Sequence, residues 1–407
     1  MAIQPLEGRP VLRRDFLKVG ALGLGSLALN PLHAWLQLLE LEQPAKTESF
    51  KVLTSLPSDT DIFDAYGDSL YLANSRREIN PGVWASRISY FDFVDSDFHN
   101  PVSQASISLP GSVTNLVRED EHSVFATGIH VASGSLNDRT SAITEIDFGH
   151  DKTPSVKRSF TFEHRTHFLK LFAYLPYQTA FYSTHSYERP DGEFGVLDLS
   201  DFTQMKEKGN RLSMPAALTS MTVDDRNNIV YGTNNFGHVV AIDISGGSPR
   251  FIGYQRLLDF ADDAILYHDP YSEAKFLWAI NKSNGLITEY SPDPKTFQPY
   301  TNQTAAESLT KAKSIYEPNR RQMINIGEPF KMLVIDGNQG MSLLDMKYPI
   351  RQLLQFHPPQ IEAITAAAHS KHIIVAVLSK PNPKDDLDGQ PNREIWIMDL
   401  VESSTST

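Results

Sequence analysis

Short runs of apolar and β-branched residues alternate with clusters of turn-forming residues from residue 50 onward, and one pair of runs recurs. Each pair has a run that is often apolar on both faces, a loop, and a second run that usually ends in apolar-Asp-apolar. The landmark residues are Asp92, Asp147, Asp198, Asp243, Tyr290, Asp345 and Asp399. Their separations of 55, 51, 45, 47, 55 and 54 residues are typical of four-stranded propeller blades. The pattern therefore predicts an all-β fold, a seven-bladed β-propeller over residues 50–401.

The two ends of this region predict how the ring closes. If the strands of a blade are lettered A to D from the axis outward, the recurring runs are strands B and C. The last C strand ends near Leu400, and only a polar tail, 402–407, follows. Residues 50–56 form an apolar run that precedes the first A strand at 61–66. We expect this run to pair with the last blade as its D strand, which removes exposed sheet edges.

The recurring aspartates allow two interpretations. Seven carboxylates at equivalent positions could suggest repeated catalytic groups. A short polar side chain at the end of a strand, however, commonly accepts hydrogen bonds from the backbone of the next turn. The sequence favours this structural role.

Residues 12–34 have a basic start, a short apolar run and small residues before Trp35, as a signal peptide has. The residues Arg13, Arg14, Phe16, Leu17 and Lys18 resemble the twin-arginine motif, with Leu12 where Ser or Thr is usual. The resemblance implies export of the folded protein by the twin-arginine translocon, to the periplasm, the cell envelope or the exterior. It divides the chain into a signal peptide at 1–34, a linker at 35–49 and the propeller.

The apolar run at 19–29 has 11 residues, whereas a permanent membrane-spanning helix needs about 20. We therefore expect no permanent membrane span and cleavage after Ala34. Leu32, three residues before the predicted cut, is larger than such sites prefer, so an uncleaved anchor stays open.

The composition and the motifs of the chain exclude several classes of function. The formal net charge is -12 and no basic run occurs, so we expect no nucleic-acid partner. The chain has no cysteine, which excludes disulfides, thiol nucleophiles, zinc-thiolate sites and iron-sulfur clusters. It also lacks the Gly-x-Ser-x-Gly, HExxH and phosphate-loop motifs of esterases, zinc proteases and nucleotide enzymes.

The apolar-Asp-apolar repeats over residues 50–400, in a cysteine-free chain with an export motif, resemble those of bacterial seven-bladed propellers of the YVTN and lactonase-like superfamily. This resemblance rests on the repeat pattern and implies the fold more than an activity.

The lengths of the loops between strands B and C predict a binding face. The loops at 75–86, 129–140, 185–193 and 379–393 are long, and those at 234–237, 282–285 and 337–340 have four residues each. The long loops belong to blades 7, 1, 2 and 3, which are consecutive in a closed ring. Loops of this kind often carry binding residues, although they can also be variable solvated segments. The candidate ligand-binding residues on them are Arg76, Arg77, His130, His185, Tyr187 and Glu188.

Residues that lead into the A strands lie at the same end of the channel. Those with ionisable side chains include Asp61, His167, Asp262 and Asp263. Imidazoles and carboxylates suit iron, copper or zinc, so a metal at the channel mouth is one interpretation. His164 and His167 are three residues apart, which places them on opposite faces of an extended strand. Both could be metal ligands only if the segment bends, and the identity of any cofactor stays open.

Two functions are compatible with these features. We expect an exported binding module that takes a ligand or protein of the cell envelope at the rim of blades 7, 1, 2 and 3. The alternative is a lactonase-like hydrolase or a metal-dependent enzyme whose site lies at the channel mouth.

Overall fold

The computed structural model describes the chain from residue 47 to residue 403 with gaps. The described residues are 47–58, 62–66, 69–74, 77–80, 83–92, 103–118, 122–131, 139–149, 153–163, 166–174, 176, 178–186, 191–234, 238–256, 261–268, 274–281, 287–290, 292, 322–335, 340–346, 351–357, 363–370, 373–380 and 392–403. The chain divides into two compact units, of which Glu48–Val401 is the propeller. The predicted signal peptide, 1–34, lies outside the described residues. In the described part, no helix has the length and apolar character needed to cross a membrane.

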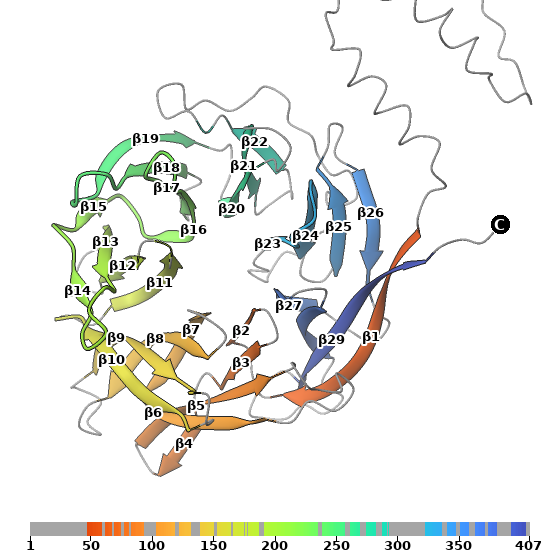
Figure 1. Ribbon diagram of the computed structural model, residues 1–407, viewed down its shortest axis with the longest axis horizontal. Helices are drawn as coiled ribbons and strands as arrows, with labels where there is room; N and C mark the ends of the chain where they lie inside the picture. Colours follow the sequence, from red (N-terminus) through yellow and green to blue (C-terminus); the bar gives the residue numbers. More distant parts are fainter. Residues whose placement is uncertain are drawn as a thin grey trace, which may run out of the picture. The chain divides into compact units, whose positions relative to one another are not determined.

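The described strands form seven separate sheets arranged around a central axis (Figure 1). Blade 1 contains β2 (Ile62–Tyr66), β3 (Ser69–Ala73), β5 (Val83–Asp92) and β6 (Ala105–Pro110), with β4 (Arg77–Asn80) paired to β5. Blade 2 contains β7 (Ser112–Arg118), β8 (Ser123–Val131), β9 (Arg139–Asp147) and β10 (Ser155–Thr161). Blade 3 contains β11 (Thr166–Tyr174), β12 (Thr179–Ser186) and β13 (Gly192–Asp198), with β14 (Lys206–Glu207) and β15 (Leu212–Met214) both paired to β13.

The remaining blades follow the same order along the chain. Blade 4 contains β16 (Leu218–Asp224), β17 (Ile229–Asn234), β18 (His238–Asp243) and β19 (Arg250–Arg256). Blade 5 has three described strands, β20 (Ala261–His268), β21 (Lys275–Asn281) and β22 (Ile287–Tyr290). Blade 6 contains β23 (Gln322–Asn325), β24 (Lys331–Ile335), β25 (Met341–Asp345) and β26 (Arg351–Phe356). Blade 7 contains β27 (Ala363–Ser370), β28 (Ile373–Lys380), β29 (Asn392–Ser403) and β1 (Thr47–Ser58).

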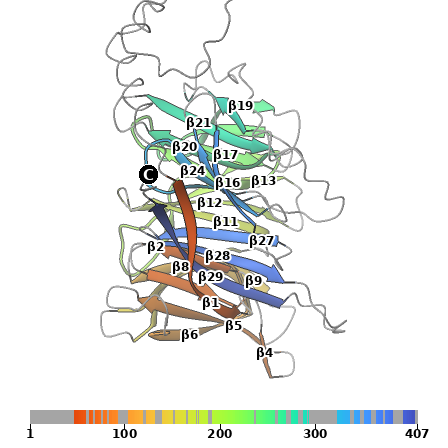
Figure 2. The same ribbon diagram turned by 90° about the vertical axis from the view of Figure 1, so that its right-hand side faces the viewer.

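Strand β1 closes the ring from the other end of the chain. It lies beside β29 as the outermost strand of blade 7 (Figures 1 and 2). The predicted seven-bladed fold and its closure by an N-terminal strand are therefore confirmed. The strand begins at Thr47, three residues before the start that the apolar run suggested.

Apolar packing between neighbouring blades holds the ring together. Strand β17 is buried at every position, because it has blades on both sides. Phe125 of blade 2 and Tyr182 of blade 3 belong to one buried cluster, and Phe181 of blade 3 and Val230 of blade 4 belong to the next. Each such side chain contributes about 1.5–3 kcal/mol by leaving water. Packing of this extent explains how a chain without disulfides holds a closed ring.

The recurring aspartates stabilise turns, as predicted, wherever their contacts are described. Oδ1 of Asp147 accepts a hydrogen bond from the Gly149 N–H at 2.7 Å. Oδ1 of Asp198 accepts from Ser200 at 2.8 Å, and Oδ1 of Asp243 accepts from Ser245 at 2.9 Å. The hydrogen bonds from Ser200 and Ser245 hold the pKa values of the Asp198 and Asp243 carboxyl groups below their ordinary value.

Three D strands carry a β-bulge at the same place. The bulged residues are Lys157 in β10, Ile252 in β19 and Leu353 in β26. A bulge interrupts the regular row of backbone donors and acceptors along an outer strand. It therefore blunts an edge that could otherwise pair with another chain.

Candidate functional site

The strand register fixes which loops share a face of the ring. His185, near the end of β12, pairs with Phe168 near the start of β11 and with Gly192 at the start of β13. The loops between strands B and C therefore lie at the same end as the beginnings of the A strands, as the sequence predicted. We call this end the long-loop face.

On the long-loop face, strand pairing continues into segments that the sequence predicted as loops. Pairing between β8 and β9 continues to Val131 and Arg139, and pairing between β28 and β29 continues to Lys380 and Asn392. In blade 4, by contrast, the pairing of β17 with β18 ends at Thr233 and Val239. The first and last residues of the long segments in blades 2 and 7 therefore extend the B and C strands.

The predicted loop at 75–86 is largely a second hairpin. Strand β4 pairs with the start of β5, so that Arg77 lies opposite Ala85 and Glu78 opposite Trp84. The sequence carries a signal for this hairpin, because Pro81-Gly82 is a turn-favouring dipeptide directly before the run that forms β5. The prediction missed it because the short run at 77–80 is polar.

The ten predicted ligand-binding residues fall into three groups. Arg76, Tyr187, Glu188 and Asp61 lie outside the described residues. Arg77, His130, His167 and Asp262 lie in strands β4, β8, β11 and β20, where the structure describes the backbone. For His185 and Asp263 the side chains are described as well.

His167 and Asp262 occupy one equivalent position in two blades. Each is the extra residue of a β-bulge near the start of an A strand. The equivalent bulged residues of blades 2, 4 and 7 are Thr114, Thr219 and Thr365. The bulge bends β11 at His167, and the interpretation of His164 and His167 as metal ligands stays a prediction. His164 itself lies outside the described residues.

Asp263 links two blades. Its Oδ1 accepts a hydrogen bond from the Ala264 N–H at 3.0 Å, and its Oδ2 accepts from the Met323 N–H of blade 6 at 2.9 Å. Both oxygens of this carboxylate therefore accept hydrogen bonds from backbone N–H groups. The contacts assign Asp263 a structural role at the channel mouth that sequence reasoning did not anticipate.

Serine hydroxyls link four other pairs of blades. The Oγ of Ser86, Ser141, Ser183 and Ser220 each accepts a hydrogen bond from a backbone N–H in the A strand of the following blade. The donors are Val113, Thr166, Leu218 and Ala264. These links fix the beginnings of successive A strands and so define the mouth of the channel.

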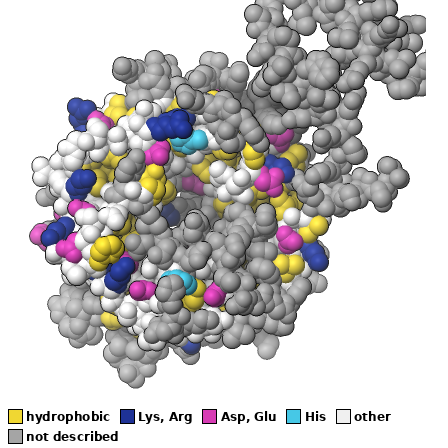
Figure 3. Space-filling model, in the orientation of Figure 1, with side chains coloured by type: hydrophobic (Ala, Val, Ile, Leu, Met, Phe, Trp, Pro, Cys, Tyr) yellow, Lys and Arg dark blue, Asp and Glu magenta, His cyan; other side chains and the backbone are white. Residues whose placement is uncertain are grey.

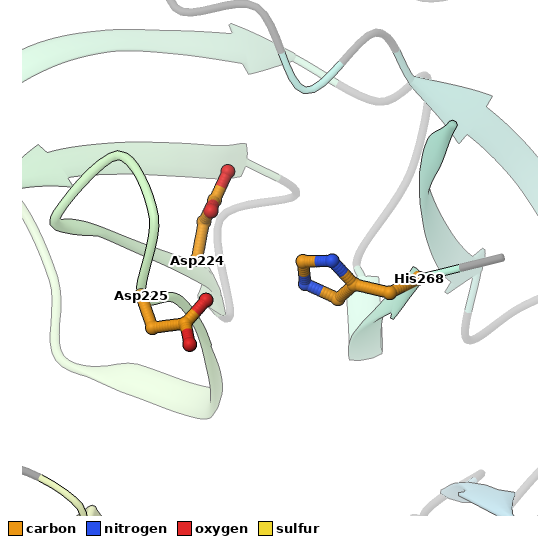
Figure 4. A group of neighbouring side chains, drawn as sticks. All are labelled: Asp224, Asp225 and His268. Carbon is orange, nitrogen blue, oxygen red and sulfur yellow. The ribbon is translucent and has the colours of Figure 1, made fainter. Parts of the chain in front are cut away.

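A second cluster of ionisable groups lies at the opposite face, between blades 4 and 5. Asp224 ends β16, Asp225 follows it in the turn, and the His268 imidazole points toward both from the end of β20 (Figure 4). Their potential ligand atoms lie within 4.8 Å of one another, the one such group of three in the described part of the chain.

Lys275 already pairs with one of the two carboxylates of this cluster. Its Nζ forms an ion pair with Oδ1 of the fully buried Asp224, and Asn227 donates to Oδ2 at 2.9 Å. Burial would raise the pKa of Asp224, but these partners outweigh it and lower the pKa below its ordinary value. Burial and the Lys275 ammonium lower the pKa of His268. A cation would have to displace Lys275, so the arrangement is best explained as an ion pair between blades.

Charged side chains do not segregate by sign on the face seen in Figure 3. Lys and Arg side chains alternate with Asp and Glu side chains around the described part of the ring (Figure 3). Among the described residues, this face therefore offers no single-sign patch for steering a charged partner.

Comparisons with known proteins identify the fold. No protein-family model matches the chain, and no curated protein matches it by sequence. The structure resembles Raptor from Chaetomium thermophilum, with a TM-score of 0.60 and 10% identity over 88% of this chain and 29% of the Raptor chain. It also resembles the β-propeller domain of Cps50 (Swd1) from Myceliophteria thermophila. That match has a TM-score of 0.54 and 10% identity over 87% of this chain and all of that domain. The chain spans less than a third of the length of Raptor. Because the identity is only 10% in both matches, the two likenesses show the propeller fold alone.

Proposed function

We propose that this chain is an exported β-propeller that binds a ligand or a protein of the cell envelope through the long-loop face of blades 7, 1, 2 and 3. The observation that carries this proposal is the clustering of extended hairpins in consecutive blades. In blades 2, 3 and 7 the B and C strands pair up to Val131, His185 and Lys380, and blade 1 adds the β4 hairpin.

In blades 4, 5 and 6 the B and C strands pair over fewer residues than in blades 2, 3 and 7. Their B and C strands join through short connections after Thr233, Ile280 and Ile335. A rigid ring that elaborates one sector presents an uneven rim, and binding residues are often carried on loops that a rigid scaffold positions. Export rests on the twin-arginine resemblance of residues 13–18, and the twin-arginine translocon is the partner that this address implies.

The test of the binding face is a triple variant, Arg77→Ala, His185→Ala and Tyr187→Ala. Its matched control, Arg250→Ala, Tyr254→Ala and His357→Ala, removes the same residue types from blades 4 and 6. Purified parent and variants are used to capture envelope components, which are identified by mass spectrometry and confirmed by a binding titration. We expect at least tenfold weaker binding by the rim variant alone. Equal capture by parent and rim variant, with unchanged thermal unfolding, contradicts the proposal.

A further inference from the structure

A cavity of about 170 Å³ opens where the last strand of blade 1 meets blade 2. Leu109 and Pro110, at the end of β6, form one wall. The floor is the face of blade 2 that carries Ala126, Gly128 and Ala142. Because β6 ends and β7 begins here, the cavity lies at the long-loop face, beside the β8–β9 hairpin of the proposed rim.

Small side chains in blade 2 leave this space empty. Ala126, Thr144 and Ser159 lie side by side across β8, β9 and β10, and Gly128, Ala142 and Thr161 form the next row. In blade 4, the row equivalent to the first is Gly232, Val240 and Tyr254. A tyrosine therefore stands in blade 4 at the position of Ser159 in blade 2, so the fold accommodates a large side chain at this position.

Gly128 brings two strands together at the edge of the cavity. A Cβ atom at this position would lie 2.1 Å from the backbone oxygen of Ser112. Only glycine permits this approach, which keeps the beginning of β7 against β8 and shapes the cavity wall.

The lining carries hydroxyl groups and no charge. Ser112, Thr144, Ser159 and Thr161 contribute the hydroxyls, and the other lining residues are apolar or glycine apart from Thr127. Ser159 Oγ donates a hydrogen bond to Thr144 Oγ1 at 3.2 Å, so the Thr144 hydroxyl proton can be donated to a ligand. An ion would lose its hydration here without an opposite charge to replace it.

We propose that this cavity binds one neutral, ring-sized group that carries a hydrogen-bond acceptor. Its volume is close to that of protein cavities that hold a single benzene ring, about 150 Å³. The inference deepens the proposed function and rests on it for one step, namely that the group belongs to the ligand of the rim. The chemistry of the cavity can be tested without that ligand.

The experiment titrates the protein with phenol, which is neutral at pH 7, and with benzoate, an anion of similar size. Binding is measured by saturation-transfer NMR and by the chemical shifts of the protein. We expect saturable phenol binding in the millimolar range and at least tenfold weaker binding of benzoate. Ser159→Leu should fill the cavity and weaken phenol binding at least tenfold. Ser213→Leu, the same change at an exposed position of β15 in blade 3, should leave it unchanged.

Ala142→Val is a second cavity-filling variant from a different strand, and thermal unfolding verifies that each variant is folded. The proposal is overturned if phenol does not bind, if benzoate binds equally, or if both folded cavity variants bind phenol like the parent.

The link between the cavity and the ligand of the rim is tested separately. If a cavity variant loses phenol binding but captures partners like the parent, the cavity does not bind a group of the rim's ligand, and that step of the proposal is overturned. Loss of capture by the Arg77, His185 and Tyr187 variant, with phenol binding intact, supports both sites. If the rim variant captures partners like the parent, the proposed function is overturned. The phenol titration then still shows whether the cavity binds a neutral ring.

Discussion

The Oγ of Ser183 in blade 3 accepts a hydrogen bond from the backbone N–H of Leu218 in blade 4 at 2.8 Å. The same hydroxyl donates to the carbonyl oxygen of Glu193 at 3.1 Å. One side chain thus satisfies a buried donor of the next blade and an acceptor of its own blade. A link of this kind aligns neighbouring sheets that otherwise touch through apolar side chains, which lack directional preference.

Ser183→Ala should lower the free energy of unfolding by about 2 kcal/mol, because it leaves the buried Leu218 N–H without an acceptor. Urea denaturation of the purified protein measures this change. The control is Ser213→Ala at an exposed position of β15, for which no change is expected. Equal stability of the two variants would show that the link between blades contributes nothing.

Thr127 and Thr233 occupy equivalent positions in blades 2 and 4 but differ in their contacts. Oγ1 of Thr127 is fully buried and has no hydrogen-bond partner among the described residues, whereas Oγ1 of Thr233 lies 2.9 Å from Ser220 Oγ. Thr127→Val should therefore stabilise the protein by about 1 kcal/mol, and Thr233→Val should destabilise it by a similar amount. Chemical denaturation compares them, and destabilisation by Thr127→Val would contradict the assignment.

Lys275→Met should lower the free energy of unfolding at pH 7 by about 3 kcal/mol, because Asp224 would remain buried without its cation. The folded-state pKa of Asp224 is depressed, so its stabilising contribution is present above the unfolded pKa near 4 and is lost as the pH falls. Without Lys275, burial raises that pKa, and the destabilisation should be relieved on acidification. The stability difference between parent and variant should thus shrink from pH 7 to pH 4.

Denaturation curves at several pH values test this prediction. The matched control is Lys206→Met, which removes an exposed lysine 3.8 Å from Asp201 and should leave stability unchanged. A constant difference between parent and Lys275→Met across the pH range would exclude Asp224 as the titrating group.

Replacing both Arg13 and Arg14 by lysine should keep the folded protein inside the cell. Twin-arginine recognition depends on the planar guanidinium groups, which lysine lacks. The location of a fused reporter measures the effect, and Arg9→Lys, a change of the same kind before the motif, is the control. Export of the double variant at the parental level would remove the basis for placing the protein outside the cytoplasm.

The repeated strands could be predicted because their local pattern and their buried environment agree. Ile229 to Thr233 reads as a strand apolar on both faces, and β17 is buried throughout. The roles of Asp263 and Asp224 could not be predicted, because their partners Met323 and Lys275 come from the following blade. Contacts between blades depend on how neighbouring sheets are aligned, and the repeat pattern does not specify that alignment.

The pairing of β1 with β29 also sets an order of events during synthesis. In blades 1 to 6, the described strands come from consecutive stretches of the chain, so each can assemble as it emerges. Blade 7 cannot, because β1 precedes blades 1 to 6 in the chain and its partner β29 follows them. A chain that lacks β29 leaves the edges of β1 and β28 unpaired, and such edges promote aggregation and recognition by quality-control factors. The pairing of β1 with β29 therefore distinguishes a chain that contains every strand of the propeller from one interrupted before β29.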